Sequence, residues 1–97
     1  MKIRWSAPAL ADRLSIIDYI ASESARAAAA VDDRVSSAVN RLCDFPRSGR
    51  TGRVAGTREL VIVQTPYLVI YQIDDNVISI LRVLHGAQRW PDGLPES

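Results

Sequence analysis

Apolar positions alternate at the start of the chain and then recur at helical spacing, which predicts a strand followed by a helix. Ile3 and Trp5 alternate with basic residues, so Lys2–Trp5 is expected to be a strand. Ser6 then suits an N-cap and Pro8 suits the first turn of a helix. The apolar stripe expected on this amphipathic helix consists of Leu10, Leu14, Ile17 and Ala21.

A second helix is predicted from about Ala25 to Leu42, after a break at Ser22–Ser24. The alanine run Ala27–Ala30 favours helix and is small enough to let two helices approach closely as a hairpin. Pro46 closes the segment. The apolar face expected on this helix consists of Val31, Val35, Ala38 and Leu42.

Three apolar runs in the second half predict strands at Thr57–Val63, Tyr67–Ile73 and Val77–His85. Short connections between them require antiparallel neighbours, and the Arg- and Gly-containing stretch before them, Arg47–Gly56, is expected to be a surface loop. The middle run is apolar on both faces, which is typical of a central strand with helices on one side. A chain this short has little left to cover the other face, so a partner chain is expected there.

These elements predict an α+β fold in which an N-terminal strand and a two-helix hairpin pack with a small, mainly antiparallel sheet. The chain of 97 residues is expected to form one domain over residues 1–97. A hydrophobic fraction of 47% and a charged fraction of 24% are ordinary for a folded protein and argue against disorder. No apolar run approaches ~18 residues, which argues against a membrane helix or signal peptide, and the lone Cys43 fits a reducing compartment such as the cytoplasm.

Charge is distributed unevenly, although the formal net charge is only +1. That small net charge argues against a dedicated nucleic-acid coat or a membrane-surface protein. Between residues 47 and 59, however, four arginines stand beside a single acidic residue, Glu59. This basic loop is either a binding surface or simply a solvated face, and Arg58 and Glu59 are either functional or take part only in cross-strand pairing. Its arginines are Arg47, Arg50, Arg53 and Arg58.

Polar residues inside the last apolar run and just after it are the other candidates for function. RNA cleavage needs a group to accept a proton, a donor for the leaving oxygen and positive charge over the phosphate, which His, Tyr and Arg side chains can supply. One His and one Cys form no recognised metal-ligand spacing, so no metal or cofactor is expected. The candidate set is Arg50, Arg53, Arg58, Tyr67, Tyr71, Arg82, His85, Arg89 and Trp90.

Each of these residues also has a structural interpretation. Arg82 alternates with Ile80 and Leu84 and is able to reach a carboxylate across the sheet, while His85 falls on the opposite face, as a hydrogen-bonded strand-end residue or a base. Tyr67 and Tyr71 share one face and are typical packing tyrosines. The Trp90–Pro91 pair is expected to anchor the tail over the sheet edge.

The chain as a whole resembles the RelE/ParE superfamily of small bacterial toxins. The resemblance rests on the opening Ile3–Leu10, the segment Pro46–Leu60 with Gly-Thr-Arg-Glu at 56–59, the strand Pro66–Tyr71, and the ending Leu-Arg-Val-Leu-His at 81–85. The Gly-x-Arg-Glu and Arg-Val-x-His patterns are similar to the ParE branch. This resemblance implies the toxin of a type II toxin–antitoxin pair, such as those that serve plasmid stabilisation, bound in a hetero-oligomeric complex by a ParD-like antitoxin that neutralises it.

The resemblance also implies two possible targets. ParE-like toxins inhibit DNA gyrase and bacterial growth without a known hydrolytic reaction, whereas RelE-like toxins cleave mRNA on the ribosome. RelE-type nucleases carry an arginine where this chain has Leu68, which favours gyrase. If the chain were an endoribonuclease, its catalytic residues would be His85, Arg82 and Tyr71; a non-toxic protein-interaction module is the third alternative.

Overall fold

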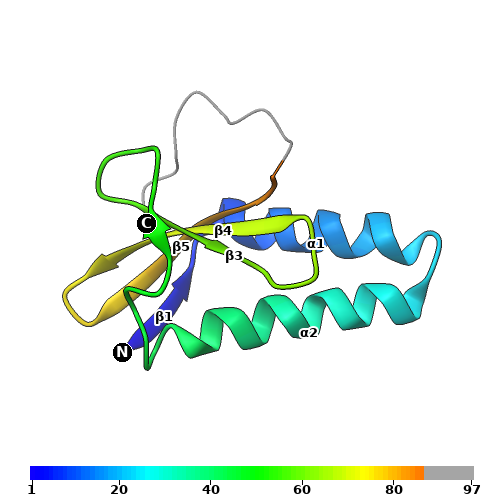
Figure 1. Cartoon of the computed structure of the whole chain (residues 1–97). Coiled ribbons are helices and arrows are strands. Elements are labelled where there is room, and N and C mark those ends of the chain that lie inside the picture. Colours follow the sequence, from blue (N-terminus) through cyan, green and yellow to red (C-terminus); the bar gives the residue numbers. More distant parts are fainter. Residues whose placement is uncertain (87–97) are drawn as a thin grey trace.

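Five strands form one mixed sheet in the computed structural model, which describes residues 1–86 (Figure 1). Their order across the sheet is β1-β5-β4-β3-β2, with β1 parallel to β5 and every other neighbouring pair antiparallel. The antiparallel meander expected from the short connections is therefore confirmed. The strands are β1 Lys2–Trp5, β2 Arg50–Thr51, β3 Arg58–Val61, β4 Tyr67–Asp74 and β5 Val77–His85.

Two helices, α1 Ala7–Ala21 and α2 Ala25–Arg41, run side by side on one face of the sheet (Figure 1). Ser6 caps α1, because its hydroxyl oxygen accepts the Ala9 N–H at 3.1 Å, and Ser24 caps α2 in the same way. The Ser6 N–H and hydroxyl also donate to β5 carbonyls, which attaches the start of α1 to the sheet. The predicted hairpin, its Ser6 cap and the α+β class are confirmed, and Ser24 in the predicted break is the N-cap of α2.

The main core lies between the hairpin and the sheet. The predicted face of α2 lies in this core, with Val35 buried, Val31 and Ala38 partly buried, and Leu42 buried as the C-cap. Val39, which was not predicted, is buried beside them. The sheet contributes side chains from the helix-facing side of the two longest strands and from the residue that follows β3. These sheet residues are Ile62, Tyr67, Val69, Tyr71, Ile78, Ile80 and Val83.

The stripe predicted on α1 does not face this core. Leu10 and Leu14 are 46% and 65% exposed, whereas the residues that pack inward are Ala9, Ile16 and Ile20. Both stripes have helical spacing, so periodicity alone does not distinguish them. With the second stripe facing inward, the small Ala9 packs against the sheet. The same orientation lets Asp12 pair with Arg82 and Arg13 pair with Asp32.

A β-bulge in β5 changes which residues share a face. Ile80 pairs with Tyr71 and Arg82 pairs with Ile70, so Leu81 is an extra residue on its strand. Beyond the bulge the alternation is reversed, and the prediction that Ile80 and Leu84 lie on one face with Arg82 is wrong. Ile80 belongs to the helix-facing core, whereas Leu84 belongs to a second cluster, with Leu68, Ile70 and Leu81.

The second cluster lies on the outer face of the central strand, and its residues are at most 5% exposed. The predicted 47–56 loop needs correction, because it contains β2, whose Arg50 pairs with Glu59. Neither helix of the part described is long and apolar enough to cross a membrane.

Candidate functional site

The basic loop is fastened to the sheet by a buried tyrosine. The Tyr71 hydroxyl donates to the Pro46 carbonyl at 2.7 Å and accepts the Gly49 N–H at 2.9 Å. Burial raises the pKa of Tyr71, and the Gly49 N–H and the Arg58 charge offset this only in part, so the hydroxyl keeps its proton. Gly49 is required here, since an added Cβ would lie 2.7 Å from the ring. Tyr71 is therefore a structural anchor.

The neighbouring residues of β3 hold the same loop from two sides. Arg58 donates to the carbonyls of Gly49 at 2.8 Å and Arg47 at 3.3 Å. Glu59 is buried, and its carboxylate accepts hydrogen bonds from the Arg50 side chain at 3.1 Å and from the Arg53 N–H at 2.9 Å. Desolvation raises the pKa of Glu59, but these hydrogen bonds and the two arginine charges outweigh it and lower the pKa overall. Glu59 thus pairs across the strands with Arg50 of β2, whereas Arg58 bonds to backbone carbonyls of the loop.

Arg82 reaches a carboxylate, as its structural interpretation predicted, but this carboxylate is on helix α1 rather than across the sheet. Its Nε and Nη2 donate to the two oxygens of Asp12 on α1 at 2.6 and 2.8 Å, and the Val83 N–H donates to the same carboxylate at 3.0 Å. Hydrogen bonding to Asp12 raises the pKa of Arg82 despite partial burial, so the guanidinium stays charged. The bidentate pair ties α1 to β5 next to the bulge.

The remaining candidates lie at the end of β5 or beyond it. His85 is exposed and lies opposite Tyr67, with the two rings edge to face at a centroid distance of 5.6 Å. Tyr67 is buried in the helix-facing core, which supports its packing interpretation. Arg89 and Trp90 fall outside the described residues, as does the expected Trp90–Pro91 anchor. Within residues 1–86, no three metal-binding side chains come together.

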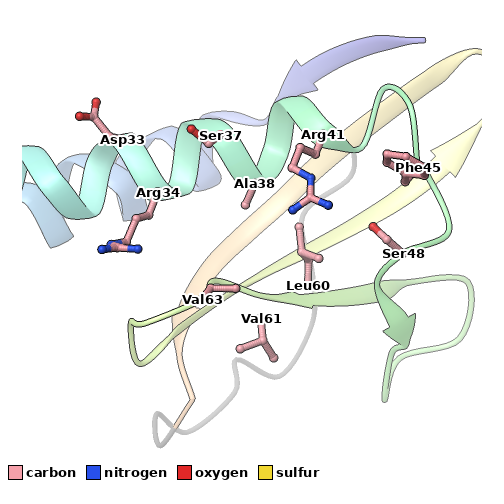
Figure 2. Close-up of a pocket in the computed structure, with 10 residues that line it drawn as sticks. All are labelled: Asp33, Arg34, Ser37, Ala38, Arg41, Phe45, Ser48, Leu60, Val61 and Val63. Carbon is pink, nitrogen blue, oxygen red and sulfur yellow. The ribbon is translucent and has the colours of Figure 1, made fainter.

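A groove of about 590 Å³ lies between α2 and the β3 side of the sheet (Figure 2). Its apolar surface includes Val61, Val63 and Phe45, whose exposed fractions are 53%, 70% and 58%. Figure 2 shows the Arg41 guanidinium above Leu60, between helix and strand. The lining residues are Asp33, Arg34, Ser37, Ala38, Arg41, Phe45, Ser48, Leu60, Val61 and Val63.

Of these lining residues, the sequence predicted Ala38 on a helix face, Ser48 in the surface loop and Leu60, Val61 and Val63 in a strand, but it did not predict a groove. Arg34, Ser37 and Arg41 recur at helical spacing, which places them on one face of α2, and that spacing is the signal that would have found them. Apolar groove walls carrying two arginines are chemically suited to an amphipathic segment with acidic side chains. Arg34 and Arg41 form no ion pair within residues 1–86.

The fold and the groove define a small toxin-like α+β domain, and comparisons with known proteins agree. A toxin–antitoxin assembly described as the chromosomal ParDE system from P. aeruginosa contains a chain that superposes with a TM-score of 0.76 at 26% identity, over 86% of this chain and 92% of that one. The RelBE2 toxin–antitoxin complex of Mycobacterium tuberculosis gives a TM-score of 0.59 at 28% identity, over 90% and 92%.

The family follows from sequence. The model of the ParE toxin of the type II toxin–antitoxin system parDE matches residues 3–90. The protein Y4kP of Sinorhizobium fredii, named as a toxin, is 43% identical over 96% of both chains, and Toxin RelE2 of Caulobacter vibrioides is 37% identical over 90% of this chain and 97% of its own. The chain belongs to the ParE toxin family of type II toxin–antitoxin systems, within the RelE/ParE superfamily, and the resemblance seen in its motifs is confirmed.

Proposed function

We propose that this toxin acts in the cytoplasm by inhibiting DNA gyrase, rather than by cleaving mRNA. The observation that carries the proposal is that two of the groups available for RNA cleavage have structural partners. Tyr71 bonds to Pro46 and Gly49 in a buried position, and Arg82 is held by Asp12. Leu68, at the position of the RelE-type arginine, belongs to the buried second cluster. Releasing these groups for catalysis would leave buried polar partners unsatisfied.

The groove between α2 and β3 supports a second part of the proposal, that a small ParD-like antitoxin neutralises the toxin. An antitoxin segment with alternating apolar and acidic residues would cover Val61 and Val63 and pair its carboxylates with Arg34 and Arg41. A segment that orders on binding is able to wrap such a groove. Arg50 of the basic loop, whose side chain is 61% exposed, is a further candidate contact for the same antitoxin or for the target.

The target is tested with purified toxin in two parallel assays, gyrase supercoiling and cleavage of ribosome-bound mRNA. We expect loss of supercoiling with mRNA intact, and the His85→Ala variant should stay inhibitory because no proton transfer is asked of it. A nuclease using His85 as its base would instead lose about 10² to 10⁴ in rate. Cleaved mRNA with normal supercoiling would reverse the choice of target, and absence of growth inhibition in a bacterial host would favour a plain interaction module.

A further inference from the structure

Glu59 is the single acidic side chain of the basic loop, and its environment differs from that of its arginine partners. The Glu59 side chain is 4% exposed, whereas the side chains of Arg50 and Arg53 are 61% and 56% exposed. Glutamates are almost never buried so deeply without a partner, because removing the charge from water is costly. Here the buried member of each pair is the acid, and the arginines that it holds face solvent.

The two oxygens of Glu59 hold different parts of the loop. Oε1 accepts hydrogen bonds from Nε and Nη2 of Arg50, at 3.3 and 3.1 Å. Oε2 accepts the backbone N–H of Arg53 at 2.9 Å and lies 3.7 Å from the Arg53 Nε. One edge of the planar Arg50 guanidinium is therefore engaged by Glu59, and among the described residues 1–86 its Nη1 side keeps its donors for a second anion.

The rest of the loop is ordered around this contact. Gly52 donates its N–H to the Thr57 carbonyl at 2.8 Å, and an added Cβ on Gly52 would lie 2.2 Å from the Thr57 hydroxyl oxygen. The Tyr71 anchor and Arg58 hold the chain that enters β2. A binding group that is already fixed before its ligand arrives loses less conformational entropy on binding, so Arg50 is preorganised.

We propose that Glu59 is a positioning residue that holds Arg50 in the orientation needed to bind a carboxylate of an acidic protein segment. The proposal rests on the proposed function, since the segment is taken to belong to the antitoxin. Arg50 and Glu59 pair across β2 and β3, so they share a face of the sheet, and Ser48 in the groove lies only two residues before Arg50. Arg50 is therefore two residues along the chain from the groove wall.

A protein carboxylate fits the surroundings of Arg50 better than a nucleic-acid phosphate. The neighbouring groove presents apolar side chains, including Val61 and Phe45, which match alternating apolar and acidic residues and offer nothing to a phosphodiester backbone. The net charge of +1 also provides little of the long-range field on which nucleic-acid binding depends. The experiment below therefore includes an oligonucleotide, so that binding of a phosphate in place of a carboxylate would be detected.

The test follows the Arg50 Nε–H resonance by NMR while hexaglutamate peptide is added to the labelled full chain. For Glu59→Gln, a positioning role and a role in simple charge neutralisation predict opposite changes in the affinity for hexaglutamate. If Glu59 positions Arg50, the variant should bind roughly tenfold more weakly. If Glu59 only neutralises, the variant gains net positive charge and should bind more tightly. Asp75→Asn, in the β4–β5 turn at φ 53°, makes the same charge change away from the loop and should bind like the wild type.

Arg50→Lys keeps the charge but removes the planar fork, and it changes an exposed side chain, so it stays informative if Glu59→Gln fails to fold. Because this variant lacks the Arg50 resonance, its binding is followed through the backbone N–H of Arg53, which also bonds to Glu59. We expect it to lose binding to a similar degree, and wild-type affinity in this variant would overturn the proposal. So would unchanged or tighter binding by Glu59→Gln, absence of any hexaglutamate effect on Arg50, or a shift of the Arg50 resonance by a hexathymidine oligonucleotide alone. Because this assay involves neither gyrase nor ribosomes, its failure would leave the proposed toxicity untouched.

Discussion

The two helices of the hairpin meet the sheet in different ways. Helix α1 is joined to β5 by the bidentate Arg82–Asp12 pair, with the Val83 N–H on the same carboxylate. Helix α2 packs its valines into the core, yet its outer edge and β3 leave the groove open between them. We call these the closed side and the open side of the hairpin.

The difference separates charges used for folding from charges left for a partner. On the closed side, Arg82 has its carboxylate within the chain and is mostly buried. On the open side, Arg34 and Arg41 lie beside exposed Val61 and Val63, an arrangement that costs solubility and brings no stability to the single chain. An arginine inside an apolar strand is thus no guide to function by itself. Its role depends on whether the fold places a carboxylate of the same chain beside it.

The largest expected effect comes from breaking the closed side. Asp12→Ala should lower the free energy of unfolding by about 3 kcal/mol, since it leaves the Arg82 charge partly buried and unpaired. Urea denaturation followed by circular dichroism measures this loss. The double variant Asp12→Leu with Arg82→Met should recover most of it, because apolar residues replace the whole pair. A loss below about 1 kcal/mol for Asp12→Ala would show that the closed side contributes little.

On the open side, a charge in the groove should weaken antitoxin binding and leave folding intact. Val63→Asp places a carboxylate among the apolar groove residues. We expect the small ParD-like antitoxin to bind this variant roughly 30-fold more weakly, a loss of about 2 kcal/mol, as measured by calorimetry. Its unfolding free energy should stay within about 0.5 kcal/mol of wild type. Leu14→Asp, an equally exposed position on the outer face of α1, is the matched control and should bind normally. Equal weakening by both variants would remove the groove from the proposal.

The smallest expected effect is a pH dependence of stability from Glu59. This residue combines the two roles, because it stabilises the loop and also positions Arg50 for a partner. Its pKa is lower in the folded chain than the ordinary value of 4.5, so its stabilising contribution is present above that value and is lost as the pH falls through the folded pKa. Glu59→Gln should therefore cost about 1 kcal/mol at pH 7. The gap between variant and wild type should narrow on acidification, measured by urea denaturation at pH 7 and pH 3.5. A gap that is constant with pH would mean that the Glu59 charge is not what stabilises the loop.

Local signals in the chain predicted most of the elements. Ser6 and Pro8 mark the start of α1 by hydrogen bonding and backbone preference that depend only on neighbouring residues. The short connections after β3 and β4 leave no arrangement other than antiparallel neighbours. The arginine-rich loop and its nearby Glu59 were also recognisable, although the partners of each arginine were not.

What the sequence by itself determined is therefore the two helices and four of the five strands in their order along the chain, the α+β class, and membership of the RelE/ParE superfamily, because each depends on local spacing or on motifs. Only the tertiary structure decided which stripe of α1 faces inward, where the bulge at Leu81 reverses β5, and which chain segment flanks the groove. The physical reason is that local sequence gives an apolar strand or helix stripe no preference for one face over the other. Contacts with residues distant in the sequence decide which face is buried. Asp12 for Arg82 and Tyr71 for Gly49 are such partners, distant in sequence and adjacent only in the fold.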